Sequence, residues 1–142
     1  KSTDNTTQLT TFTGGCLCGD VEYSVTTEIE DFIYVTAAMT KITGSAFASN
    51  ILTKPVDVLW TSGFGKVKRF DYPGTRTFTK VFCIECGSGL PYLNEKGSAL
   101  VIPAGSLNDE PVLKPQYNIF WNDRAQWYEA GIEAPQCSNF AK

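Results

Sequence analysis

The chain has 142 residues, a net charge of -3, 42% hydrophobic residues and 13% aromatic residues, which is typical of one domain with a core of its own. The net charge is negative and no basic run occurs, so we do not expect nucleic acid as a partner. No apolar stretch approaches the ~20 residues of a membrane span, so we do not expect a membrane as a partner either. The sequence contains no histidine, which excludes Ser-His-Asp and Cys-His catalytic relays and leaves Cys, Asp or Glu as zinc ligands.

Residues 1–10 are expected to form a disordered or frayed tail, and residues 11–142 a single domain. The first residues are polar and rich in threonine, and they lack the apolar core of a signal peptide. Because no targeting segment is visible, we expect a cytoplasmic protein.

Short alternating or apolar segments predict a mostly β protein. Turn residues such as Gly, Pro, Asn and Asp separate these segments, and their close spacing favours sandwich-like sheets over βαβ units. One short helix is expected within residues 36–50, where Gly44 limits its length. The predicted strands lie at residues 21–25, 32–35, 56–60, 77–82, 100–102 and 117–121.

Four of the five cysteines form two close pairs, Cys16 with Cys18 and Cys83 with Cys86, and each pair is flanked by glycine. Two such pairs separated by a long insert are typical of a four-cysteine structural zinc site. Disulfides would require an oxidising compartment, and a redox C-x-x-C motif would require a βαβ setting. The spacing therefore predicts one structural zinc ion. Cys137 stands alone and is interpreted as an ordinary thiol.

Four motifs resemble the glutathione-dependent formaldehyde-activating enzyme family, which also includes centromere protein V. They are TGGCLCGDVEY at residues 13–23, FCIECGSGL at 82–90, AGSLND at 104–109, and the segment 120–127. The resemblance covers nearly the whole chain in the right order. It implies a small multi-sheet β fold built around a zinc ion that four cysteines hold. By resemblance, the ligands would be Cys16, Cys18, Cys83 and Cys86.

The chain departs from the family where a second, catalytic zinc would be bound. Members carry a Cys-His-Cys-x-x-Cys-Arg segment just before a Ser/Thr-Gly-x-x-Phe turn, which is present here as TGSAF at residues 43–47. Counting back from this turn, the three cysteine positions fall on Tyr34, Thr36 and Met39. A phenol with a pKa near ~10, a hydroxyl and a thioether do not make a catalytic zinc site at neutral pH. The family's zinc-dependent glutathione chemistry is therefore not expected here.

A converted site is the sharper of two hypotheses for this region. The cleft would hold a different small molecule, and Tyr34, Thr36 and Lys41 would carry out metal-free acid/base chemistry of lyase, isomerase or cyclase type. The high aromatic content would supply the walls of the pocket. The expected substrate-binding residues are Met39, Ser45, Phe47, Trp60, Phe64, Phe120 and Trp121.

The other hypothesis is decay to a catalytically inactive binding or structural module in which the lost site is repacked. A further alternative is a carbon-sulfur lyase that acts on a thiol adduct, as in the parent family. We favour conversion, because both cysteine pairs and the turn beside the lost site are intact. A protein-interaction module has no basic patch, exposed apolar run or peptide-binding signature in its favour. The sequence leaves the oligomeric state open, with a homodimer among the alternatives.

Overall fold

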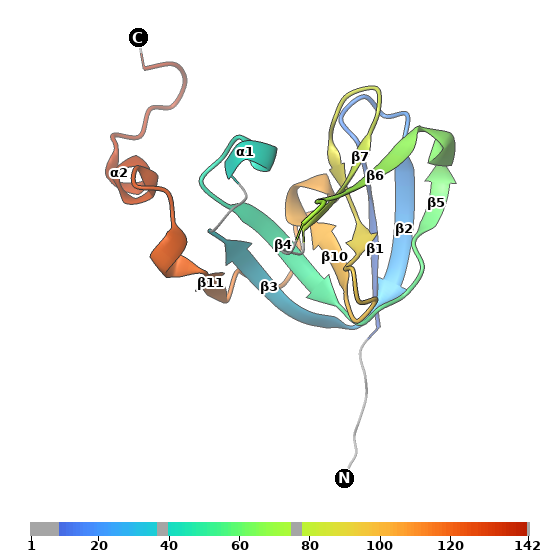
Figure 1. The fold of residues 1–142 in the computed structure, drawn as a ribbon. Coiled ribbons are helices and arrows are strands. Elements are labelled where there is room, and N and C mark those ends of the chain that lie inside the picture. The colour runs from blue at the N-terminus through green and yellow to red at the C-terminus, as the bar shows by residue number, and fades with distance from the viewer. Residues whose placement is uncertain (1–8, 37–39, 75–77, 142) are drawn as a thin grey trace.

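The computed structural model describes residues 9–36, 40–74 and 78–141, and most of its regular structure is β-strand, arranged in three sheets (Figure 1). The predicted mostly β class is thus confirmed. None of the described helices has the length and hydropathy needed to cross a bilayer. The helical segments are α1 (Thr40–Thr43), α2 (Tyr128–Glu133) and the 3-10 turns η1 (Phe64–Lys66), η2 (Ala104–Ser106) and η3 (Trp121–Asp123).

The first sheet has the order β1-β2-β5, and all its pairs are antiparallel. Alternation places Tyr23 and Val25 in the core, as the sequence predicts for this strand. The strand predicted at 56–60 begins later, at Leu59. The strands are β1 (Thr10–Gly15), β2 (Glu22–Thr27) and β5 (Leu59–Ser62).

The second sheet has the order β11-β3-β4-β10-β9, and β11 runs parallel to β3. The short helix expected within residues 36–50 is confirmed as α1, which takes up only part of that range. In the described part, helix α1 ends before Gly44, whose φ of 67° stops it, and the segment from Ala48 is a strand. The strands are β3 (Ile29–Val35), β4 (Ala48–Thr53), β9 (Tyr92–Leu93), β10 (Leu100–Pro103) and β11 (Tyr117–Ile119).

The third sheet, of order β6-β7-β8, carries the second cysteine pair at the end of β7. All three sheets contribute to one core, to which β2 supplies Tyr23, β4 supplies Ile51 and β8 supplies Leu90. This shared core fixes the sheets relative to one another. The strands are β6 (Val67–Asp71), β7 (Thr79–Cys83) and β8 (Gly89–Leu90).

Candidate metal centre and adjoining cleft

Four cysteine side chains converge from two loops that are far apart in the sequence. The sulfurs of Cys16, Cys18, Cys83 and Cys86 all lie within 4.8 Å of one another. The Sγ atoms of Cys16 and Cys18 are 3.5 Å apart, and those of Cys18 and Cys83 are 3.9 Å apart. A tetrahedral zinc with Zn–S bonds of about 2.3 Å requires sulfurs about 3.8 Å apart. The donor set therefore fits zinc, and its softness also suits iron.

Tight turns shape both cysteine loops. Gly19 has a φ of 84° and its N–H donates to the carbonyl of Cys16, at 3.2 Å. Gly87 has a φ of 77° and its N–H donates to the carbonyl of Cys83, at 2.7 Å. Glycine populates this left-handed region at little cost, which explains why a glycine follows each pair.

Ser88 connects the two cysteine loops. Its hydroxyl oxygen accepts the N–H of Leu17 at 3.0 Å, and it lies 3.2 Å from Cys86 Sγ. Hydrogen bonding from the Ser88 hydroxyl, together with amide N–H groups of Cys18 and Ser88, lowers the pKa of Cys86 to about 6. A thiolate is the form that binds metal, and the Ser88 contact stabilises that form at Cys86. Cys137 is exposed and does not belong to the cluster.

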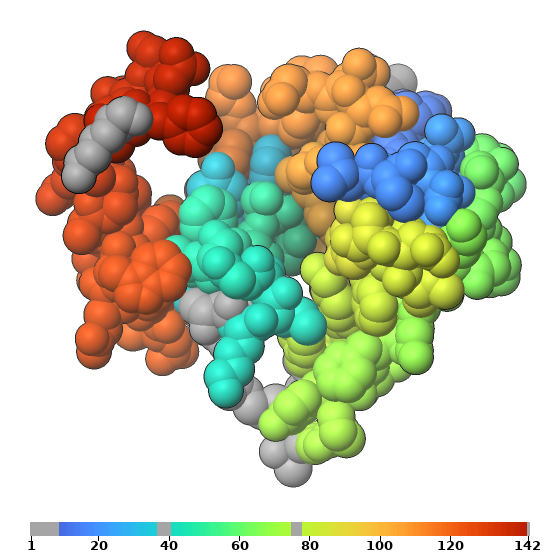
Figure 2. Space-filling model, turned by 90° about the horizontal axis from the view of Figure 1, so that it is seen from above, coloured from blue at the N-terminus to red at the C-terminus, as the bar shows by residue number. Residues whose placement is uncertain are grey.

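A cleft of about 630 Å³ opens next to the cysteines. Ile42 of α1 and Phe47 lie on one side of it, Lys80 and Gly89 of the third sheet lie on the other, and Cys16 lies at its edge. Seen from above, the molecule is hollowed between α1 and β7 (Figure 2). The volume suits a small organic ligand.

A second cavity of about 580 Å³ lies beside the first and is lined by Tyr34. The two cavities share the residues Gly105, Leu107 and Asn108, so they meet at η2. The ring of Tyr34 stacks on the ring of Phe47, with centroids 4.4 Å apart. Since Phe47 lines the first cleft, this stacked pair borders both cavities.

Thr36 is packed into the fold. The residue is 1% exposed. Its hydroxyl group can donate a hydrogen bond to the carbonyl of Ile119, at 2.9 Å, or to that of Phe120, at 2.8 Å. Phe120 is held at a φ of 59° and is itself exposed. The space at this predicted position is therefore filled. Met39 lies outside the described residues.

The C-terminal segment joins Tyr34 and Phe47 in one aromatic group. Tyr128 is buried, and its ring lies 5.6 Å from that of Phe47 and 5.4 Å from that of Trp121. The guanidinium of Arg124 lies 4.3 Å above the Trp121 ring. The structure thus brings three of the predicted residues, Tyr34, Phe47 and Trp121, into one cluster.

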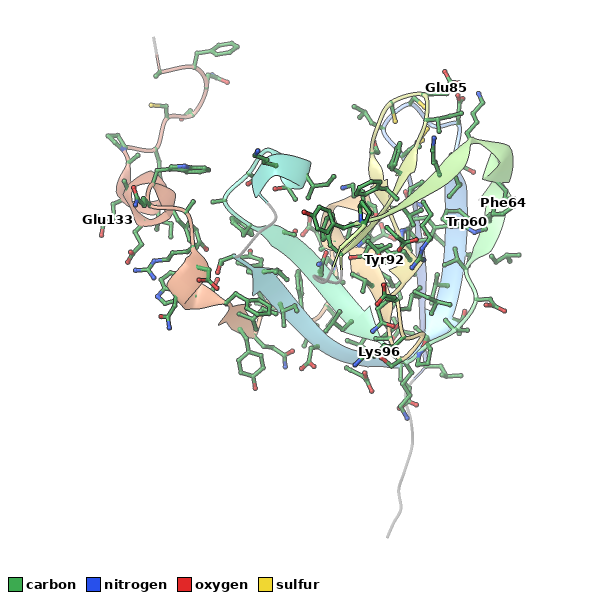
Figure 3. All side chains as sticks on the ribbon, in the orientation of Figure 1. Trp60, Phe64, Glu85, Tyr92, Lys96 and Glu133 are labelled. Carbon is green, nitrogen blue, oxygen red and sulfur yellow. The ribbon has the colours of Figure 1, made fainter. Side chains whose placement is uncertain are left out.

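Other predicted residues lie elsewhere. Trp60 packs against Tyr23 of the first sheet and against Phe64, and Figure 3 shows Trp60 and Phe64 on the side of the molecule away from α2. Lys41 and Ser45 are exposed and are not among the residues that line the two cavities. Their roles in a site stay predictions.

The polar residues of the first cleft that were not predicted from the sequence include Asn50, Lys80 and Tyr92. Burial lowers the pKa of Lys80 and raises that of Tyr92, the latter against a small opposing effect of Arg69. Lys80 alternates with the buried residues Thr79 and Val81, which in sequence indicates a solvent-facing position. Its partial burial comes from β8 and β10, which the local pattern does not reveal.

Comparison with known proteins gives a family and a fold. The family model described as glutathione-dependent formaldehyde-activating enzyme matches residues 11–123. No curated protein sequence matches the chain significantly. Among solved structures, the chain is similar to a crystal structure of a Rhodobacter sphaeroides protein, with 18% identity and a TM-score of 0.56. That likeness covers 74% of this chain and 98% of the other, and at this identity it concerns the fold alone.

Proposed function

Because the chain belongs to the glutathione-dependent formaldehyde-activating enzyme family, we propose that it retains that family's structural zinc and works without a catalytic one. Cys16, Cys18, Cys83 and Cys86 hold the structural ion. The reaction is metal-free acid/base chemistry of lyase, isomerase or cyclase type. Its substrate is a small organic molecule that binds in the cleft beside the zinc and extends into the adjoining cavity that Tyr34 lines.

The position of Tyr34 carries this proposal. It stands where the family has a zinc-binding cysteine, and its ring borders a cavity of about 580 Å³ and stacks on Phe47. Stacking fixes the plane of the phenol. In a chain with no histidine, a held tyrosine hydroxyl next to a ligand-sized space is a suitable proton donor. In this role Tyr34 protonates the leaving group or a developing oxyanion.

A binding protein without catalysis is the second candidate, and Thr36 favours it. Its hydroxyl is within bonding distance of two main-chain carbonyls, so one of the three lost ligand positions is occupied by packing. On this alternative, the cleft binds a small molecule and Tyr34 contributes only its ring. Removal of the Tyr34 hydroxyl would abolish proton donation in the enzyme, but it would leave ligand binding unchanged in the binding protein.

An activity screen separates them. The purified protein is incubated with small hydroxy acids, unsaturated carbonyl compounds and thiol adducts, and turnover is followed by NMR and mass spectrometry. For a substrate so found, Tyr34→Phe should lower the rate about 10²–10⁴-fold, the usual contribution of a positioned acid. Zinc content and melting temperature should not change.

Tyr72→Phe is the matched control, because Tyr72 is exposed in the hairpin between β6 and β7. It should retain full activity. Glutathione with formaldehyde forms a separate arm of the screen, in which we expect no acceleration of adduct formation. Full activity of Tyr34→Phe would remove the acid role. Ligand binding without turnover of any compound would favour the binding protein.

A further inference from the structure

The ammonium group of Lys80 lies inside the cleft, over a glycine. A Cβ atom placed on Gly89 would stand 2.8 Å from Lys80 Nζ and 3.8 Å from Pro103 Cγ. Lys80, Gly89 and Pro103 all line the cleft. The missing side chain at Gly89 therefore makes room for the ammonium group.

Lys80 has no counter-charge in the part of the chain that the structure describes. The ion pairs found there use other lysines and arginines, and none of the side-chain hydrogen bonds involves Lys80 Nζ. Its pKa is lowered by burial. A partly buried ammonium without an anion is unfavourable, and a bound anion would offset that cost.

Asn50 supplies a second unpartnered polar group beside the same proline. Its side chain is 9% exposed and lines the cleft, and no hydrogen bond to its carboxamide is found among the described residues. Asn50 is the direct partner of Pro103 in the antiparallel pair of β4 and β10, so their side chains lie on one face of the sheet. Lys80 and Asn50 thus both belong to the part of the cleft lining that contains Gly89 and Pro103. Buried amides normally have partners, which points to a ligand here.

We propose that Lys80 and Asn50 bind a carboxylate, so that the ligand of the cleft is a small organic monocarboxylate. The inference rests on the proposed small-molecule function of this cleft. Among the described residues that line the cleft, Lys80 is the one lysine or arginine, and the one carboxylate is that of the exposed Glu22. A single ammonium with one amide donor matches a monoanion, whereas phosphate is usually held by several cations or by a series of main-chain N–H groups.

Paired carboxylates and amides test this site by NMR titration of the full-length, zinc-containing protein. The probes are benzoate with benzamide, phenylacetate with phenylacetamide, propionate with propionamide, and inorganic phosphate. We expect at least one carboxylate to bind about tenfold or more tightly than its amide, the scale of a charge-assisted hydrogen bond. The shifted resonances should be those of cleft residues.

Three variants test whether Lys80 is responsible for the preference for carboxylates over amides. Lys80→Met should abolish it, and Gly89→Ala should reduce it, because the new methyl group displaces the ammonium without changing the net charge. Lys96→Met is the control, since Lys96 is exposed in a turn that Figure 3 shows at the far end from the zinc loops, and it should behave as wild type. Zinc content and circular dichroism verify the fold of each variant.

The proposal is overturned if no carboxylate binds more tightly than its amide, if Lys80→Met keeps the preference, or if phosphate binds best. These outcomes are independent of catalysis. Carboxylate binding through Lys80 without turnover would leave the site standing and remove the proposed reaction. Turnover of a neutral compound without any preference for carboxylates would support the proposed reaction and remove the carboxylate site.

Discussion

At the scale of single residues, Tyr34 and Thr36, which the sequence predicts to stand at the family's catalytic cysteine positions, have different surroundings. Tyr34 keeps a ligand-sized space beside its ring, whereas Thr36 is 1% exposed and its hydroxyl faces the carbonyls of Ile119 and Phe120. Thr36 therefore ties the end of β3 to the C-terminal segment. At the end of β3, Tyr34 thus borders an open cavity, whereas Thr36, two residues later, is fully packed.

Thr36→Val tests this contribution to stability. The change keeps the shape of the side chain and leaves two carbonyls near a methyl group, so we expect a loss of about 1–3 kcal/mol in the free energy of unfolding. Urea denaturation of the zinc-containing protein measures it. A variant as stable as wild type would mean that the hydroxyl does not hold the C-terminal segment in place.

At the scale of elements, alternation predicts the strands that have one buried face, such as β2 and β7. It is less informative for residues 36–50, where alanines favour a helix although pairing with β3 and β10 makes β4 a strand. Tertiary context overrides propensity there. The four-cysteine cluster was predictable, because two motifs with close spacing identify it. Asn50 and Lys80 were not, since their burial depends on strands distant in sequence.

The first cysteine loop connects β1 to β2, and the second connects β7 to β8. A metal ion bound by all four cysteines would therefore link the first and third sheets. Cys83→Ser should lose the metal and lower the melting temperature by more than about 10 °C, because metal binding is part of the folding free energy. Cys137→Ser is the matched control and should change the melting temperature very little, since that thiol is exposed. A Cys83→Ser protein with unchanged zinc content and melting temperature would refute the four-cysteine assignment.

At the scale of the whole molecule, three sheets share one core and the metal loops lie at its edge, next to the cleft. A metal ion held by the four cysteines would support one wall of the cleft, while the stacked pair of Tyr34 and Phe47 forms a border between the two cavities. Such an arrangement separates a structural role for the ion from the chemistry proposed for the side chains. The account requires that one metal site is retained and that the second has been lost.

Metal content is the most direct test of this central claim. Purified protein is washed with a weak chelator, and zinc and iron are then measured by elemental analysis and native mass spectrometry. We predict about one zinc ion per chain, because one set of four thiolates is present and Tyr34 and Thr36 replace two ligands of the other. Two tightly bound zinc ions per chain, or a protein that folds with none, would contradict the account.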